Sequence, residues 1–270
     1  MYQFGFIGMG NMGSAMLKGC LSVFPASTLA FSRKDAVKGK ALSLETGAVW
    51  IDSNRACAEQ SRYIILAVKP QFYDGVLKEI QPVLDDSRII ISLAPSYTIA
   101  DLKQSLGASA RIIRAMPNTP AMVGEGMTGL SWSEDVFSDT ERQELMQFFS
   151  SFGKTETVPE NLMDAVTAAS GSSPAFIYMM IEALADGVVK YGMPRDKAYT
   201  FVAQAVLGSA KMVLETGEHP GVLKDKVCSP GGTTIAAVAA LEASGFRSSL
   251  IEAVSARSEE RRVGKECRSR

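Results

Sequence analysis

The sequence has few side chains that bind metals or form disulfides. Its 270 residues include four cysteines and one histidine, His219. The cysteines, Cys20, Cys57, Cys228 and Cys267, are scattered, and no two of them form a CxxC pair. Neither a zinc site nor a disulfide framework is indicated, so a reducing, cytoplasmic location is expected. A histidine-rich metal site is excluded, and a Ser-His-Asp triad would have to use His219. We therefore expect no metal.

The sequence also lacks an excess of charge of either sign and a long apolar run. It holds 28 Lys and Arg against 29 Asp and Glu, a net charge of −1. This balance argues against nucleic acid or a membrane surface as the main partner. No apolar run reaches the roughly 18 residues of a membrane span. The opening residues, MYQFGFIG, have no basic region, so no signal peptide is expected. A small molecule is the expected partner.

In its first half the sequence alternates β-rich runs with helical segments. The β-rich runs are Tyr2–Ile7, Leu29–Ser32, Tyr63–Val68, Arg88–Leu93 and Arg111–Ala115, and the helical segments include Ser14–Val23 and Lys34–Thr46. This alternation predicts βαβ units and an α/β fold with a doubly wound, mostly parallel sheet. A capping box, Ser138 to Glu141, opens a further helix that stops at Gly153.

After about residue 160 the β-rich runs disappear and long helices rich in Ala and Met follow. Ser173-Pro174 is typical of an N-cap with proline at the first helical position, and the helix it opens runs to Gly192. A second helix runs from Pro194 to Gly217. Both are apolar on most faces, which favours burial against another subunit, with packing against the first domain as the alternative.

We therefore predict a dinucleotide-binding domain over 1–160 and a helical substrate and dimerisation domain over 161–256. The last residues, 257–270, carry six basic and three acidic side chains. The helical periodicity breaks up there, and we expect an end that is disordered or not native, without a function.

A glycine-rich turn, Gly8-x-Gly10-x-x-Gly13, follows the first strand and opens a helix. In that context the three glycines permit a tight turn, close approach of a pyrophosphate, and close packing of helix on strand. The free N–H groups of the helix N-terminus then bind the phosphates. The alternative is a purely structural turn.

The residues at the end of the second strand indicate whether the dinucleotide is NAD(H) or NADP(H). NAD enzymes place an acid there for the ribose 2′-hydroxyl, whereas this strand ends in Ser32-Arg33-Lys34. A hydroxyl and two cations suit a 2′-phosphate, so NADP(H) is favoured. Asp35 is close enough to leave NAD(H) open as a cofactor that is used less well.

A second glycine-rich turn lies in the C-terminal half, in CSPGGTT (228–234), directly before an apolar helical run. Successive N–H groups at Gly231, Gly232, Thr233 and Thr234 form an anion nest, and the hydroxyls of Ser229 and the two threonines add donors. Such a nest fits a small carboxylate or a phosphate. The alternative is a helix N-cap joined to a glycine-rich linker.

These motifs together resemble the pyrroline-5-carboxylate reductases. The matching stretches are GFIGMGNMG (5–13), AVKPQ (67–71), IIRAMPNTPA (112–121), DAVTAASGSSPAF (164–176), SAKMVLETGEHPG (209–221) and PGVLKDKVCSPGGTTIAAVAALE (220–242). The resemblance extends from residue 2 to about residue 256. It implies NADPH-dependent reduction of Δ1-pyrroline-5-carboxylate to L-proline, a Rossmann domain followed by an all-helical dimerisation domain, and a homodimer that can assemble into larger rings.

The resemblance also implies roles for individual residues. The residues that line the cofactor would be Ile7, Gly8, Met9, Gly10, Asn11, Met12, Gly13, Ser32, Arg33, Asn54, Ala67, Val68, Lys69, Pro70, Ser92, Leu93, Ala94 and Asn118. The substrate would be bound by Ser229, Gly231, Gly232, Thr233 and Thr234, with Ser172 and Glu160 as weaker candidates. The catalytic residue would be Thr234, which orients the imine nitrogen or relays a proton from water.

Two other functions remain open at this stage. The glycine-rich N-terminal stretch also resembles the β-hydroxyacid dehydrogenases, but these place a catalytic lysine on a helix after a glycine-rich turn, and SGSSPAF has no such lysine four residues on. A catalytically silent NADP-binding sensor or scaffold is the second alternative. It would leave the second anion-binding turn unexplained.

Overall fold

The computed structural model describes the backbone of residues 1–266 and the side chains of residues 1–256. It divides into two compact units between Ser172 and Ser173. The division predicted from the sequence lies earlier, after residue 160, and so precedes a helical segment that belongs to the first unit.

The first unit is built on an eight-stranded sheet with the order β3-β2-β1-β4-β5-β6-β7-β8. The strands are β1 (Tyr2–Ile7), β2 (Leu29–Ser32), β3 (Val49–Ile51), β4 (Ser61–Leu66), β5 (Ile89–Ser92), β6 (Arg111–Met116), β7 (Gly126–Trp132) and β8 (Gly153–Thr157). Neighbouring strands pair in parallel except for β6 with β7. The predicted α/β fold with a mostly parallel sheet is confirmed.

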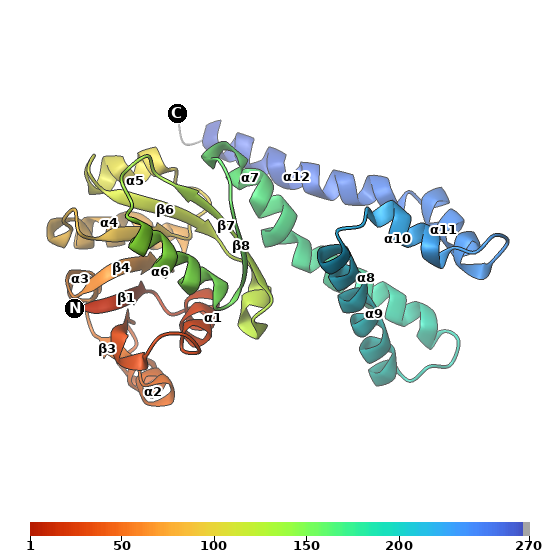
Figure 1. Ribbon diagram of the computed structural model, residues 1–270, viewed down its shortest axis with the longest axis horizontal. Coiled ribbons are helices and arrows are strands. Elements are labelled where there is room, and N and C mark those ends of the chain that lie inside the picture. The colour runs from red at the N-terminus through yellow and green to blue at the C-terminus, as the bar shows by residue number, and fades with distance from the viewer. Residues whose placement is uncertain (267–270) are drawn as a thin grey trace. The chain divides into compact units, whose positions relative to one another are not determined.

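Helices cover both faces of this sheet (Figure 1). They are α1 (Asn11–Cys20), α2 (Ala36–Thr46), α3 (Asn54–Glu59), α4 (Tyr73–Ile80), α5 (Ile99–Leu106), α6 (Asp139–Ser150) and α7 (Met163–Val166). Because side chains alternate along a strand, Phe6 packs with Phe148 of α6 in one core, and Ile64 packs with Leu77 of α4 in the other. The doubly wound arrangement follows from this alternation.

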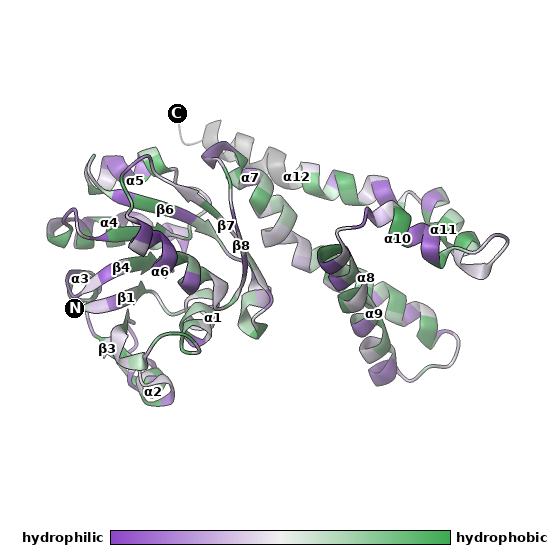
Figure 2. Cartoon of the chain, viewed as in Figure 1, coloured by the Kyte–Doolittle hydropathy of each residue, from purple (hydrophilic) through white to green (hydrophobic). Residues whose placement is uncertain are grey.

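Among the described residues of the second unit, every regular element is a helix. Its helices are α8 (Ser173–Val189), α9 (Arg195–Thr216), α10 (Pro220–Val227), α11 (Thr233–Ala243) and α12 (Phe246–Glu266). As predicted, α9 begins after Pro194 and ends at Gly217, whose φ of 64° closes the helix. Figure 2 shows hydrophobic residues along α8 and α9.

Two expectations about helix ends are wrong. Ser173 is not an N-cap, because a π-helical turn over Thr167–Ser172 leads directly into α8. Pro174 cannot donate a hydrogen bond and its ring crowds the preceding turn, and a widened π turn accommodates both effects. The helical periodicity does not end at residue 257 either, since α12 continues to Glu266. Residues 267–270 lie outside the described residues.

Within the described residues, no helix has both the length and the apolar character needed to cross a membrane. The same residues contain no group of three or more His, Cys, Asp or Glu side chains placed to hold a metal ion.

Candidate functional site

The N-terminal glycines form an open cradle between β1 and α1. Gly8 has a φ of 95°, a conformation that favours glycine. A Cβ on Gly13 would lie 2.4 Å from the Gly8 carbonyl oxygen, so only glycine lets the helix pack this closely. Gly10 is the N-cap of α1, and a Cβ there would meet nothing within 4 Å. The cradle therefore leaves room beside the free N–H groups of α1, where a pyrophosphate could approach.

The residues predicted to line the cofactor all lie in the first unit. Most of them stand at or just beyond the carboxyl ends of parallel strands, where open α/β sheets bind ligands. Ile7, Ser32 and Ser92 end β1, β2 and β5. The residues just beyond strands are Gly8 to Gly13 after β1, Arg33 after β2, Ala67 to Pro70 after β4, Leu93 and Ala94 after β5, and Asn118 after β6. Asn54 opens α3 after β3.

A pocket of about 430 Å³ lies beside this edge of the sheet. It is lined by the predicted residues Gly8, Met9, Ser32, Arg33, Asn54 and Val68 together with Lys34, Gln71, Phe72, Gly75, Val76 and Glu79. The Lys34 ammonium lies 5.9 Å from the centre of the Phe72 ring. The two cations at this end of the site, Arg33 and Lys34, suit a phosphate on the ribose.

Asp35, which left NAD(H) open in the sequence, has a local role. Its carboxylate accepts the backbone N–H of Lys38 at 3.0 Å and so caps the N-terminus of α2. The Lys38 N–H also lowers the pKa of the Asp35 carboxyl. A carboxylate engaged in capping is a poorer partner for a ribose hydroxyl, which supports a 2′-phosphate at this position.

Tyr73, the first residue of α4, joins the ends of β4 and β5. Its phenol donates to the Leu66 carbonyl at 2.8 Å and accepts the N–H groups of Leu93 and Ala94 at 3.1 and 3.0 Å. Its ring is buried, and burial raises its pKa to about 12, so the phenol stays protonated. Tyr73 thus fixes the backbone of the loop after β5 that was predicted to line the cofactor.

Asn118, predicted to line the cofactor, has both ends of its amide engaged within the first unit. Its Nδ2 donates to the Ser170 carbonyl at 3.1 Å, and its Oδ1 accepts the Met127 N–H at 2.8 Å. Asn118 therefore ties the loop after β6 to the π-helical turn that ends at Ser172, a candidate substrate residue.

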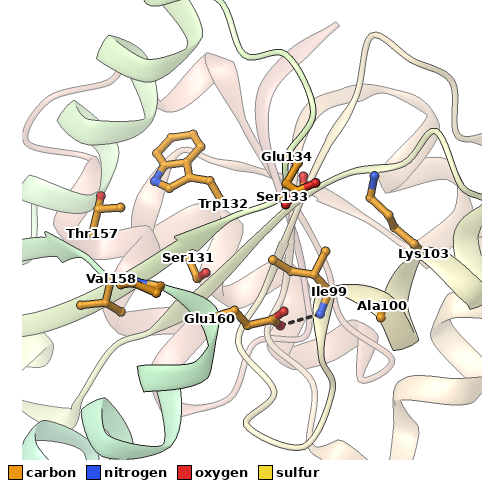
Figure 3. Close-up of a pocket in the computed structure, with 11 residues that line it drawn as sticks. Ile99, Ala100, Lys103, Ser131, Trp132, Ser133, Glu134, Thr157, Val158 and Glu160 are labelled. Carbon is orange, nitrogen blue, oxygen red and sulfur yellow. Dashed lines mark hydrogen bonds between the residues drawn. The ribbon is translucent and has the colours of Figure 1, made fainter.

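Glu160, the other weaker substrate candidate, lines a second pocket of about 670 Å³ (Figure 3). Its carboxylate accepts the backbone N–H of Ile99 at 2.7 Å and the guanidinium of the buried Arg114 at 2.8 Å. A buried arginine is costly without such a partner. These contacts give Glu160 a structural role beside the predicted one.

The second glycine-rich turn opens α11, as the sequence predicted. Gly231 has a φ of 67°, Gly232 is the N-cap, and the helix begins at Thr233. One expected donor is engaged elsewhere, because the Gly232 N–H donates to the Ser229 carbonyl at 3.0 Å. The remaining nest consists of Gly231 and the first N–H groups of α11, at Thr233 and Thr234, which have no acceptor within the helix.

The side chains before this turn are engaged with one another. Lys224 pairs with Asp225 at 2.6 Å, and Lys226 pairs with Glu218 at 2.5 Å. The Nδ1 of His219 accepts the Gly221 N–H at 3.1 Å, so the single histidine caps α10. Anion binding at the turn would therefore rest on backbone N–H groups and hydroxyls.

Tyr73, Glu79 and Arg114 were not predicted from the sequence. One signal was available for Arg114: a charged residue inside the apolar run IIRAM predicts a buried ion pair. Tyr73 and Glu79 lie on one amphipathic helix, α4. The sequence pattern of such a helix indicates which side chains are buried, but not which distant residues they contact.

Two family models match the chain. One is described as pyrroline-5-carboxylate reductase dimerisation and covers residues 160–263. The other is described as NADP oxidoreductase, coenzyme F420-dependent, and covers residues 3–96.

Individual relatives match over nearly the full length. The pyrroline-5-carboxylate reductase of Escherichia coli (strain K12) is 45% identical over 255 residues, which are 93% of this chain and 94% of that protein. The solved structure of a pyrroline-5-carboxylate reductase from Coxiella burnetii has a TM-score of 0.90 at 31% identity and covers 97% of both chains. Plasmodium falciparum pyrroline carboxylate reductase, solved with NADP bound, has a TM-score of 0.85 at 32% identity and covers 97% of both chains.

Proposed function

The chain belongs to the pyrroline-5-carboxylate reductase family, and we infer that it catalyses the NADPH-dependent reduction of Δ1-pyrroline-5-carboxylate to L-proline, the last step of proline biosynthesis. The observation that carries this inference is the near full-length match to enzymes of that name. The open cradle at Gly10 and the glycine-rich turn at the start of α11 agree with it.

The first unit would hold the dinucleotide. Its pyrophosphate would bind the free N–H groups at the start of α1, next to Gly10, and the cations Arg33 and Lys34 would bind the 2′-phosphate beside Ser32. Tyr73 would keep the loop of Leu93 and Ala94 in place beside it. When bound, NADPH supplies the hydride that reduces the C=N bond.

The second unit would hold the substrate. We propose that the substrate carboxylate binds the N–H groups of Gly231, Thr233 and Thr234, with the hydroxyls of Ser229 and Thr233 as further donors. The Thr234 hydroxyl would lie beside the ring nitrogen and orient it by a hydrogen bond, or relay a proton to it from water. A cyclic iminium can arrive already protonated, so a strong acid is not needed. Orientation would account for most of the rate.

The decisive experiment follows the oxidation of NADPH by absorbance in the presence of Δ1-pyrroline-5-carboxylate. Wild type should oxidise NADPH rapidly. Thr234→Ala should lose about 10²-fold in kcat, the usual contribution of a residue that moves or orients a proton. Thr200→Ala is the matched control, because its hydroxyl bonds only within α9, to the Asp196 carbonyl, and it should retain full activity.

Each other outcome has a distinct meaning. An unchanged rate in Thr234→Ala would keep the reaction and remove the role given to Thr234. Binding of NADPH by wild type without any turnover would favour a silent sensor.

The chain self-associates through its helical unit, which matches the family's dimerisation model. An apolar groove of about 530 Å³ between α8 and α9, lined by residues such as Leu184, Val202 and Val213, is a surface that a second copy could cover. We propose a homodimer that can assemble into larger rings. Sedimentation velocity of the purified protein would give the number of subunits in the assembly.

We also propose that the protein works in the cytoplasm, without a nucleic-acid partner. The thiols of Cys20, Cys57 and Cys228 are free, and the net charge is −1. Fractionation of the native host and a gel-shift assay with duplex DNA would test the two statements.

A further inference from the structure

Three polar side chains form a hydrogen-bonded chain in the pocket proposed for the ribose end of the cofactor: Ser32 at the end of β2, Asn54 at the start of α3 and Glu79 on α4. The Ser32 hydroxyl donates to Asn54 Oδ1 at 2.7 Å. Asn54 Nδ2 donates to Glu79 Oε2 at 2.9 Å, and Glu79 Oε1 accepts the Arg55 N–H at 3.4 Å. All three residues Ser32, Asn54 and Glu79 line the pocket.

The chemistry of Glu79 fixes the direction of this chain. A carboxylate can only accept hydrogen bonds, so the atom of Asn54 that faces it must be the amide nitrogen. The carbonyl oxygen of Asn54 then faces Ser32, and an oxygen of that kind can only accept. The Ser32 hydroxyl, which is almost completely buried, must therefore give its single proton to Asn54.

This direction leaves the Ser32 oxygen with acceptor capacity only. A ribose 2′-hydroxyl can donate to such an oxygen. A 2′-phosphate at neutral pH is an acceptor and would need the proton that Ser32 gives to Asn54. Glu79 also adds a negative charge to a pocket in which Arg33 and Lys34 are the cations. Both effects disfavour NADPH relative to NADH.

We propose that Glu79 is a specificity-determining residue that limits the preference for NADPH over NADH, and that it acts through Asn54 and Ser32. The inference rests on the proposed function, because it assumes a dinucleotide in this pocket. Arg33 and Lys34 attract the 2′-phosphate, and Glu79 opposes them. The pocket can then bind either NADPH or NADH. The preference between them depends on the balance between the attraction of the two cations and the opposing effect of Glu79.

Glu79→Gln tests this proposal. The introduced glutamine amide can donate to Asn54 Oδ1 when the Asn54 amide rotates so that its oxygen faces residue 79. The Asn54 Nδ2 then faces Ser32 and donates to the Ser32 oxygen, so the Ser32 proton becomes free for a phosphate. The dissociation constants of NADPH and NADH are measured without substrate, by titrating the fluorescence of the dihydronicotinamide. The ratio of the NADH to the NADPH constant should rise about fivefold to tenfold in Glu79→Gln.

Two further variants separate the effect of the hydrogen-bonded chain on this ratio from the effect of removing a negative charge anywhere near the pocket. Glu59→Gln removes the same charge from an exposed position on α3, outside the residues that line the pocket, and should leave the ratio unchanged. On a Ser32→Ala background, Glu79→Gln should change the ratio by less than it does in wild type, because the proton of Ser32 is no longer there to redirect.

The outcomes distinguish this inference from the proposed function. An unchanged or lower ratio in Glu79→Gln, with both cofactors still bound, would overturn the inference alone. An equal change in Glu59→Gln would also overturn it. A wild type that binds neither cofactor would overturn the proposed function and the inference together.

Discussion

At the scale of single residues, Tyr73 shows how one hydroxyl can hold several backbone groups. It bonds one carbonyl and two N–H groups from the ends of two strands. Tyr73→Phe keeps the ring but leaves these groups without their partner in a buried place. We expect a loss of about 2 kcal/mol in the free energy of unfolding, measured by urea denaturation.

Tyr97→Phe is the matched control for this substitution. Tyr97 stacks on Tyr73 with ring centres 4.8 Å apart, and its hydroxyl donates to Asp74 at 2.6 Å in an exposed position. Because water can replace that bond, the loss should stay within about 0.5 kcal/mol. Equal losses in the two variants would mean that the bonds of Tyr73 to the strand ends contribute little.

The same residue marks the limit of what the sequence could predict about the site. Gly8, Gly10 and Gly13 were found because a local turn places strict demands on residue type. Tyr73 and Glu79 act on strand ends and on a residue of another helix, far away in the chain. A period of 3.6 residues shows that a side chain is buried or exposed, but not which backbone groups it meets.

At the scale of elements, Gly153 determines whether β8 can join the sheet. A Cβ on Gly153 would lie 2.0 Å from the Gly126 carbonyl oxygen of β7, and its φ is 149°. Gly153→Ala should therefore cost more than about 3 kcal/mol in the free energy of unfolding, since the backbone of β7 must move.

Gly107→Ala provides the comparison, because Gly107 also has a positive φ, 114°, but a Cβ there would meet nothing within 4 Å. It should show backbone strain alone, about 2 kcal/mol. Thermal or urea unfolding of the two variants measures the difference. Equal losses would mean that the approach of β8 to β7 does not constrain residue 153.

The strands explain why the sheet was predicted only in part. The β1 and β2 segments are apolar runs that are buried on both faces, and their bounds were predicted correctly. The β8 sequence, GKTET, is polar and lies at an edge of the sheet, and β3 has only three residues. Such strands are formed by their neighbours, so their own periodicity is too weak to indicate them.

At the scale of the whole molecule, the helical unit buries too little of itself to be complete alone. Among its described hydrophobic residues, Ala185, Ala198 and Val202 are buried, whereas Tyr191, Phe201 and Leu214 are 88%, 65% and 65% exposed. A unit with so small a core needs another surface to cover its apolar side chains. The family model for dimerisation that matches residues 160–263 supports self-association, and we propose that a second copy provides that surface.

The last prediction concerns which chains build one active site. Gly10→Ala should fold, because its Cβ meets nothing within 4 Å, but it should block the pyrophosphate. Thr234→Ala should remove the hydroxyl proposed to orient the imine nitrogen, which belongs to the other unit. If the site combines the first unit of one subunit with the helical unit of its partner, a dimer of these two inactive chains contains one intact site.

Co-expression with two different affinity tags, followed by purification through both, isolates the mixed dimer. Such a site between subunits should restore about half of the wild-type NADPH oxidation, because one of two sites is intact. A site contained within each chain would give a mixed dimer as inactive as its parents, since each chain would then carry its own defect. We expect restoration, because the apolar groove proposed to bind a second copy lies on the same unit as the proposed substrate turn. An inactive mixed dimer that still binds NADPH would place both binding sites within one chain.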